Sequence, residues 1–100
     1  MEIKKIVENE CPVLKLTGNL VSAETAALDH EITDLIKTSK NVVLDFAGVD
    51  YMASAGIRVL LSARNKLDAI GGKLTIRHPN DVVANVLDMT GIANFIEIIE

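Results

Sequence analysis

Apolar residues along the chain follow two spacings, one typical of β-strands and one typical of α-helices. Five short runs rich in aliphatic and β-branched residues predict strands. These runs are residues 3–7, 13–16, 42–46, 73–77 and 95–99. Three longer segments repeat apolar residues every three or four positions and predict helices. These segments are residues 22–37, 54–70 and 79–91.

The order of these segments predicts an α/β fold with a mixed, mostly parallel β-sheet flanked by helices. Two strands come first, joined by a turn at residues 8–10, and the full order is β-β-α-β-α-β-α-β. Alternating strands and helices favour parallel pairing, while the opening hairpin adds an antiparallel edge. The run 42–46 is almost continuously apolar, which suits a strand covered on both faces. A chain of 100 residues has room for one core, so we expect a single domain over residues 1–100.

The apolar positions also predict which side of each helix faces the core. The expected inner residues are Leu28, Ile32, Leu35, Ile36, Ile57, Leu60, Leu61, Leu67, Val82, Val83, Val86 and Leu87. Gly71 and Gly72 supply a left-handed stop for the second helix. Thr17 and Gly18 are expected to end the second strand, and Ser22 is a candidate cap for the first helix.

Composition and charge exclude several classes of function. The chain carries 10 Lys and Arg against 14 Asp and Glu, a net charge of −4 that repels nucleic-acid backbones. One Tyr, two Phe and no Trp leave no stacking platform for single strands. Cys11 stands alone, which excludes an internal disulfide and a multi-cysteine zinc site and fits a reducing cytoplasm. No signal peptide is evident, and no apolar run approaches the roughly 18 residues of a membrane span, so we expect a cytoplasmic protein. We also expect no metal or other cofactor.

The segment of residues 49–58 is the strongest candidate for a functional site. It joins the most buried predicted strand to the second predicted helix, at an edge where α/β proteins commonly bind ligands. Small residues surround Ser54 and leave its hydroxyl accessible, and a helix N-terminus stabilises a phosphate placed there. Phosphorylation would add a charge of about −1.5 to −2 to an already acidic chain. The alternative from spacing alone is that Ser54 caps the helix, in which case Ser54→Ala costs about 0.5–2 kcal/mol of stability.

Residues 52–57, MASAGI, resemble the signature of the STAS domain, and in particular that of bacterial anti-sigma factor antagonists. Three further segments agree with this family in register. They are residues 17–20 before the first helix, 71–74 after the second and 87–92 at the end of the third. The resemblance therefore covers nearly the whole chain, with the order of elements intact.

The resemblance implies a regulator of transcription rather than an enzyme. In this family the serine at the Ser54 position is phosphorylated by an anti-sigma factor, a GHKL-type serine kinase that uses Mg-ATP. The unphosphorylated antagonist binds this kinase and thereby releases the sigma factor, whereas the phosphorylated form dissociates from the kinase. A metal-dependent serine phosphatase removes the phosphate. We therefore expect partner switching through Ser54, with no catalytic residues, no contact with nucleic acid and no direct insertion into a membrane.

The expected partner surface surrounds Ser54. It comprises Asn19, Leu20, Val21, Ser22, Asp50, Tyr51, Met52, Ala53, Ala55, Gly56 and Arg58. For Tyr51 and Met52, packing over the end of the sheet is an equal alternative, and Arg58 is either a solvated helix charge or a contact for the phosphate. The patterning gives no large apolar patch, so we expect a monomer.

One position departs from the family, because Ala53 stands where an Asp usually precedes the serine. This departure leaves a second hypothesis open, an unswitched STAS adaptor subunit of a membrane-transport or lipid-trafficking system. Asp45 at a strand end imitates the phosphoacceptor of a response-regulator receiver, but the further carboxylates that would hold Mg²⁺ are lacking. An enzyme is also disfavoured, since Ser54 lacks the G-x-S-x-G surround of a nucleophile elbow and no ligand cluster surrounds His30 or His78.

Overall fold

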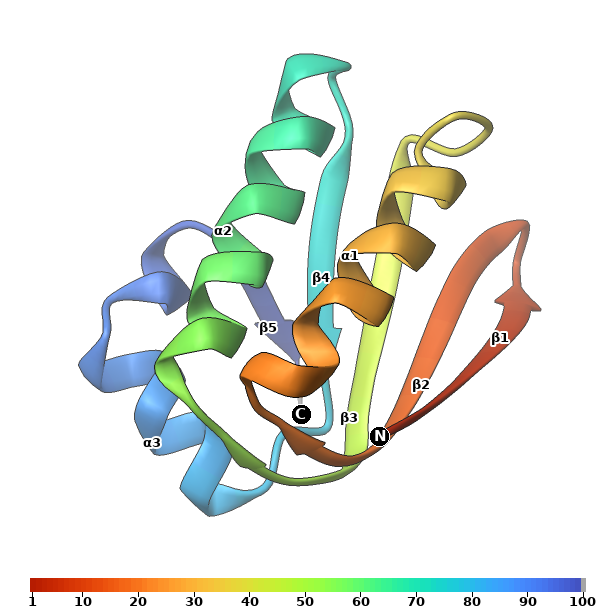
Figure 1. The fold of residues 1–100 in the computed structure, drawn as a ribbon. Coiled ribbons are helices and arrows are strands. Elements are labelled where there is room, and N and C mark those ends of the chain that lie inside the picture. The colour runs from red at the N-terminus through yellow and green to blue at the C-terminus, as the bar shows by residue number, and fades with distance from the viewer. Residues whose placement is uncertain (100) are drawn as a thin grey trace.

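A computed structural model describes residues 1–99 and shows a five-stranded β-sheet with helices packed on it (Figure 1). In chain order the elements are β1 (Glu2–Glu8), β2 (Cys11–Leu20), α1 (Ser22–Leu35), β3 (Asn41–Met52), α2 (Ser54–Ala69), β4 (Lys73–Arg77), α3 (Asp81–Met89), the 3-10 helix η1 (Ile92–Asn94) and β5 (Glu97–Ile99). The predicted α/β fold class and the succession of strands and helices are confirmed. The sequence pattern did not predict η1, and Glu100 lies outside the described residues.

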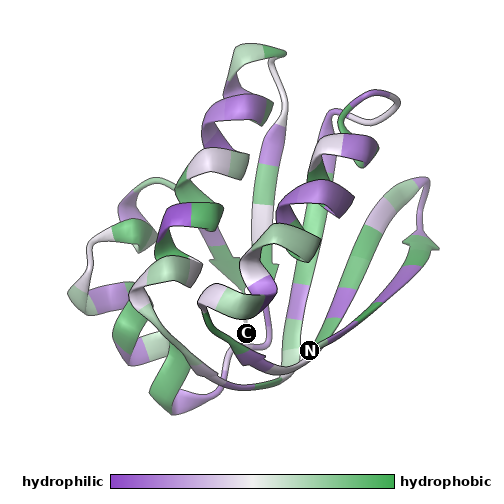
Figure 2. Ribbon diagram, viewed as in Figure 1, coloured by the Kyte–Doolittle hydropathy of each residue, from purple (hydrophilic) through white to green (hydrophobic). Residues whose placement is uncertain are grey.

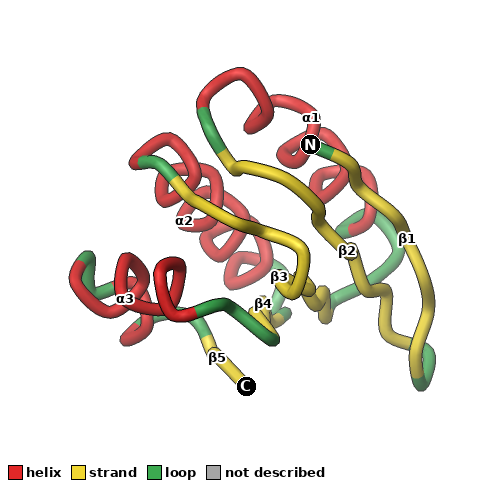
Figure 3. Tube along the Cα trace, turned by 90° about the horizontal axis from the view of Figure 1, so that it is seen from below, coloured by secondary structure: helices red, strands yellow, loops and turns green. Residues whose placement is uncertain are grey.

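The strands lie side by side in the order β1-β2-β3-β4-β5. β1 and β2 form the expected antiparallel hairpin, and all later neighbours pair in parallel. Each crossover from β2 onward steps in the same direction along the sheet, and right-handed crossovers then place their helices on the same face. Figure 3 shows α1, α2 and α3 on one side of the strands. The opposite face of the sheet carries no helix among residues 1–99. The predicted burial of residues 42–46 is nevertheless confirmed for all of them except Val43, which is half-buried.

The hydrophobic core lies between the sheet and the three helices. Hydrophobic and hydrophilic residues alternate along the central strands, as a sheet with one covered face requires (Figure 2). The strands contribute Leu14, Leu16, Leu20, Val42, Leu44, Phe46, Val49, Met52, Leu74 and Ile76, and the helices contribute Leu28, Ile32, Leu35, Val59, Leu60, Ala63, Leu67, Val83 and Leu87. In the described part of the chain no helix is long and apolar enough to cross a lipid bilayer.

Both central strands run further than the sequence predicted. β2 does not end at Thr17-Gly18 but continues to Leu20, and β3 continues to Met52, so the two stay paired through register shifts beside Gly18. Gly18 has a φ of +112°, which only glycine adopts easily. A Cβ at Gly48 would lie 2.8 Å from the carbonyl oxygen of Leu16. Glycines at these two positions therefore let the strands pass an irregularity that the hydrophobic pattern suggested was an end.

The buried sides of α2 and α3 are rotated slightly from the prediction. Leu61 is 36% exposed and Val82 is 55% exposed, so both were wrongly expected inside. In α2 the contact is made instead by small residues, among them Gly56 and Ala63, alongside Val59. Small side chains bring a helix close to its neighbours, and a hydrophobicity pattern gives them little weight.

The remaining predicted inner residues are buried or packed against the core. Ile36, Ile57 and Val86 are half-buried, and the others are buried. The left-handed stop after α2 is confirmed, since Gly71 has a φ of +73° and Gly72 donates to the carbonyl of Leu67 at 2.7 Å.

The last predicted strand is shorter than expected. Residues 95 and 96 precede β5, and Phe95 is exposed. The turn that joins β1 to β2 lies at Asn9 and Glu10, which both adopt positive φ, as a two-residue hairpin turn of type I′ requires.

Candidate functional site

The predicted site lies where the carboxyl ends of β2 and β3 meet the start of α2. The last register pair of these strands is Leu20 with Met52, and the backbone N–H of Ala53 donates to the carbonyl of Leu20 at 3.0 Å. This hydrogen bond ties the chain to the neighbouring strand immediately before α2 begins. The first residues of α2 are thereby held in a fixed position at the edge of the sheet.

Three of the expected partner-binding residues belong to the core instead. Leu20 and Met52 are fully buried, and Gly56 is buried against both. A Cβ at Gly56 would lie 2.7 Å from Cγ of Met52 and 3.0 Å from Cγ of Leu20, closer than side chains pack. These residues position the start of α2 and have no surface for a partner, so for Met52 the packing alternative is correct.

Ser54 does not cap α2. The N-cap position belongs to Ala53, and no side chain caps the helix. Ser54 is the first helical residue, it is exposed, and its hydroxyl makes no hydrogen bond within residues 1–99. The capping alternative is therefore wrong, and the hydroxyl is open to solvent.

Ser22 holds the same position in α1 and is likewise not a cap. Val21 is the N-cap residue, and no side chain accepts a hydrogen bond at this end of the helix. The carbonyl of Ser22 accepts a hydrogen bond from the hydroxyl of Thr25 at 3.1 Å. Both predicted caps thus lie one residue inside their helices.

The other expected partner-binding residues form a rim around Ser54. Asn19, Ser22, Asp50, Tyr51 and Arg58 are exposed, and Tyr51 keeps 49% of its surface open to solvent. The half-buried members are Val21, Ala53 and Ala55. Asn19, Asp50 and Tyr51 lie on the ends of β2 and β3, not on the loops in which the sequence pattern placed them. The structure therefore brings eight of the eleven predicted residues to a surface around the hydroxyl.

Asn80 supports this rim from α3, a role that the sequence pattern did not reveal. Its side-chain amide donates to the carbonyl oxygens of Val49 and Asp50 at 3.1 and 3.3 Å. Its side-chain oxygen accepts from the N–H of Val83 at 2.8 Å and caps α3. One side chain thus fastens the start of α3 to the end of β3. An Asn before an acidic first turn indicated the cap, but nothing in the sequence indicated the long-range contact.

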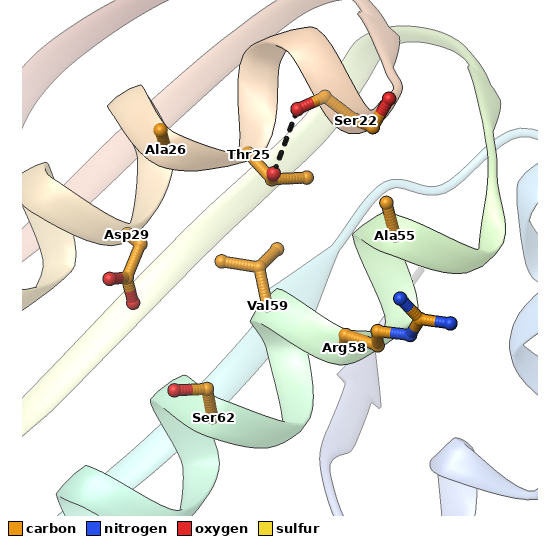
Figure 4. Close-up of a pocket in the computed structure, with 8 residues that line it drawn as sticks. All are labelled: Ser22, Thr25, Ala26, Asp29, Ala55, Arg58, Val59 and Ser62. Carbon is orange, nitrogen blue, oxygen red and sulfur yellow. Dashed lines mark hydrogen bonds between the residues drawn. The ribbon is translucent and has the colours of Figure 1, made fainter.

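A shallow groove runs from the rim between α1 and α2 (Figure 4). It encloses about 420 Å³ and is lined by Ser22, Thr25, Ala26, Asp29, Ala55, Arg58, Val59 and Ser62. Asp29 is engaged by Lys66, whose ammonium lies 3.0 Å from the carboxylate and 3.0 Å from the hydroxyl of Thr33. The groove is wide and open, and it offers no enclosed chamber for a small substrate.

The Asp45 carboxylate that resembled a receiver phosphoacceptor is engaged elsewhere. Asp45 is only 5% exposed, on the helix-free face of the sheet, where it accepts from the N–H of Ala47 at 2.9 Å and from Nε of Arg77 at 3.0 Å. Arg77 also donates two hydrogen bonds to the carboxylate of Glu8, at 2.7 and 3.1 Å. Asp45 lies within β3, not at the strand end where the sequence placed it, and it joins this ion network.

The Glu8–Arg77–Asp45 network shifts the acidity of its members. Burial raises the pKa of Asp45, but the hydrogen bonds from Ala47 and Arg77 outweigh burial and leave that pKa below its ordinary value. The hydrogen bond from Arg77 likewise lowers the pKa of Glu8, and the two carboxylates raise the pKa of Arg77. All three groups are therefore held in their charged forms.

The other residues that could bind a metal or react do not form a site within the described chain. Within residues 1–99, no three His, Cys, Asp or Glu side chains lie close enough to hold a metal ion. His30 and His78 are exposed, on α1 and directly after β4. Burial raises the pKa of the Cys11 thiol, which keeps it protonated, and its sulfur contacts the carbonyl of Asn41 at 3.5 Å.

Comparison with known proteins gives a family and several sequence relatives, among them the following two. The family model described as "STAS domain" matches residues 2–100. BtrV of Bordetella bronchiseptica, which is named as a candidate anti-sigma factor antagonist, is 32% identical over 77 residues, or 76% of this chain. The match spans 66% of BtrV, slightly less than two thirds of its length. The anti-sigma F factor antagonist of Paenibacillus polymyxa is 25% identical over 75% of this chain and 73% of its own length.

Solved structures share the fold at low sequence identity. A candidate anti-sigma factor antagonist of Thermotoga maritima superposes with a TM-score of 0.91 at 18% identity, covering 98% of this chain and 86% of that one. The antagonist SpoIIAA in its unphosphorylated form gives 0.83 at 20% identity, with coverages of 97% and 87%. The STAS domain of a SulP transporter from Vibrio cholerae gives 0.74 at 20% identity, with coverages of 95% and 77%. The fold is therefore common to antagonists and to a transporter domain.

Proposed function

This chain belongs to the STAS domain family, and we propose that it acts as an anti-sigma factor antagonist controlled by reversible phosphorylation of Ser54. Two of the sequence relatives are named as anti-sigma factor antagonists, one of them as a candidate. On this proposal the unphosphorylated protein binds an anti-sigma factor and frees its sigma factor, and the phosphorylated protein lets the anti-sigma factor go.

The observation that carries this proposal is the state of the Ser54 hydroxyl. It is exposed at the first residue of α2, and it makes no hydrogen bond within the described chain. A kinase can therefore reach Ser54 without breaking a cap or a core contact. The first turn of α2 holds no acidic residue, and the positive end of the helix dipole favours a phosphate there.

The proposed partner is a GHKL-type serine kinase that acts on Ser54 with Mg-ATP, as the family resemblance implies. The γ-phosphoryl group passes from ATP to Oγ of Ser54, ADP leaves, and the hydroxyl proton goes to a base of the kinase. A metal-dependent serine phosphatase removes the phosphate by hydrolysis. The antagonist itself supplies no catalytic residue and no cofactor, and it works as a single STAS domain and as a monomer.

The proposed docking surface is the exposed part of the rim around Ser54. Asn19, Asp50, Tyr51 and Arg58 present polar groups and one aromatic ring beside the hydroxyl. A phosphate in the middle of such a surface brings about two negative charges into an interface that must exclude water. Desolvation of that charge opposes binding, so one modification is sufficient to release the partner.

The test is intact mass spectrometry of the protein after incubation with Mg-ATP and each GHKL-type anti-sigma factor kinase of the source organism. We expect one added phosphate in the wild-type protein and none in Ser54→Ala. Ser62→Ala is the matched control, because Ser62 lies on the same helix in the groove and should leave the added mass unchanged. Phosphate on Ser54→Ala, or none on the wild type with any kinase, would contradict the proposal.

Ala53 favours one alternative, an unswitched STAS adaptor subunit of a membrane-transport or lipid-trafficking system. The family Asp that precedes the serine is absent at this position, which removes a carboxylate that could orient the hydroxyl or assist recognition by the kinase. The same experiment, together with calorimetry of binding to each kinase, separates the two functions. Binding to a kinase without phosphorylation points to a constitutive antagonist, and neither binding nor phosphorylation points to the adaptor.

A further inference from the structure

We infer that Arg58 is the internal counter-ion of the phosphate on Ser54, so that phosphorylation also withdraws this guanidinium from the partner. The inference rests on the proposed function, because it concerns the phosphorylated state of the same serine. Phosphorylation would then change the charge of the surface in two ways. The modification adds negative charge and at the same time neutralises a positive charge that the unmodified surface offers.

The spacing along α2 places the two side chains on one face. Ser54 and Arg58 are four residues apart, and side chains at that spacing are neighbours with about 5–6 Å between Cβ atoms. Long helical side chains lean toward the N-terminus of the helix. Figure 4 shows the Arg58 side chain extended away from the groove floor toward the beginning of α2. A phosphate on Ser54 therefore lies within reach of the guanidinium without a change in the backbone.

Arg58 is also available, because no other group holds it. Within the described chain it makes no ion pair and no hydrogen bond. The other two cations of α2 are engaged, since Arg64 lies over the ring of Phe95 and Lys66 binds Asp29. Guanidinium groups bind phosphate through two parallel hydrogen bonds, which fits a donor of this shape beside a new dianion.

The acidic groups around the rim leave this pairing without a strong competitor. Glu24 on α1 is paired with the amino terminus of Met1 at 3.4 Å, and Asp29 is paired with Lys66. Asp50 at the end of β3 and Asp81 in the first turn of α3 are both exposed, so solvent screens them. A phosphate dianion attracts Arg58 more strongly than either single carboxylate does.

The test is the pKa of the phosphate, measured by phosphorus NMR on protein with phosphoserine installed at position 54 during translation. An internal counter-ion favours the dianion and lowers this pKa. We expect the pKa to rise by roughly 0.5 unit in Arg58→Gln, a size typical of an exposed ion pair. Arg58→Lys should keep most of the shift. Arg64→Gln is the matched control. It removes a guanidinium from the same helix more than two turns away from position 54, so it should leave the phosphate pKa unchanged.

Equal phosphate pKa values in the wild type and in Arg58→Gln would overturn the inference. This outcome is independent of the proposed function, because the phosphoserine is installed without a kinase. Helix and fold contributions cancel in the comparison, since Arg58 is exposed and α2 is the same in both proteins.

A second measurement tests the withdrawal of Arg58 from the partner. Arg58→Gln should weaken kinase binding by the unmodified protein about fivefold, the upper range for one exposed charge pair. In the phosphoserine protein the same substitution should change the residual affinity by less than twofold. Equal losses in the two forms would show that Arg58 still reaches the partner after phosphorylation and would contradict the withdrawal.

Discussion

The rim around Ser54 and the helix-free face of the sheet differ in whether their polar side chains are paired with one another. On the sheet face, Arg77 joins Glu8 and Asp45, and Lys73 is paired with Glu97. At the rim, the Ser54 hydroxyl and the Arg58 guanidinium have no partner within residues 1–99. Both regions are polar and lie on the same strands and their connections, so composition alone does not separate them.

The difference separates side chains that maintain the fold from side chains free to meet another molecule. The network on the sheet face connects β1 to β3 and β4, and its groups satisfy one another. The rim is held from beneath by buried residues such as Gly56 and by Asn80. Its Ser54 and Arg58 side chains are exposed to solvent and bind no other group of the described chain. A rigid support under free polar groups is what a switchable docking surface requires.

The largest effect is expected from filling the close contact beneath the rim. Gly56→Val places side-chain atoms where Met52 and Leu20 already pack, so we expect it to lower the free energy of unfolding by about 2–3 kcal/mol. Urea denaturation measures this change. Ala55→Val is the control, because Ala55 is half-buried at the open groove and its variant should lose much less. Equal losses would show that the start of α2 is not held by this contact.

The next largest effect is expected on the sheet face. Arg77→Gln leaves the buried carboxylate of Asp45 without its guanidinium, and we expect a loss of about 1–3 kcal/mol in the free energy of unfolding. Lys73→Gln removes an exposed pair and should change stability by less than about 1 kcal/mol. If both variants unfold at the same urea concentration, the network contributes nothing beyond a surface ion pair.

The same network predicts how stability depends on pH. The folded-state pKa values of Asp45 and Glu8 lie below their ordinary values, so the unfolded chain binds protons first as the pH falls. The contribution of these two carboxylates to the free energy of unfolding should therefore be complete above about pH 5. It should fall as the pH drops toward about 3. Arg77→Gln should flatten this dependence. A wild-type slope of the opposite sign would contradict the assigned pKa shifts.

The smallest effect on stability is expected at the rim itself. Ser54→Ala removes no cap and no hydrogen bond, so the free energy of unfolding should change by less than about 0.5 kcal/mol. The expectation of a larger loss applied only if Ser54 capped α2. Thermal or urea unfolding checks this value, and a loss above about 1 kcal/mol would mean that the hydroxyl supports the fold after all.

The sequence predicted the fold, and it also predicted that Ser54 is exposed at the start of a helix, because both depend on local patterns. Apolar spacing located the strands and helices, and small residues around Ser54 marked an accessible helix start. Leu61 and Ala63 show where such patterns fail, because close helix packing selects small residues that hydrophobicity does not identify. The caps at Ser22 and Ser54 were wrong by one residue, which is within the usual uncertainty of helix boundaries.

The contacts that could not be predicted join residues distant in the sequence. Glu8 and Arg77 are 69 residues apart, and Arg77 and Asp45 are 32 apart, so their pairing follows from sheet register alone. Asn80 and Val49 are 31 residues apart and meet only because α3 packs over the end of β3. The length of β3 was also missed, since the predicted apolar run ends at residue 46 while the strand continues through Gly48 to Met52.

The most direct test of the central claim is the affinity of this protein for the proposed anti-sigma factor kinase, measured by calorimetry in two forms. One form carries Ser54 and the other carries phosphoserine at position 54, with all other residues the same. The account predicts that the phosphoserine form binds at least roughly tenfold more weakly, since desolvating a phosphate dianion in the interface costs more than about 1.4 kcal/mol. Equal affinities would contradict the claim that Ser54 is the switch.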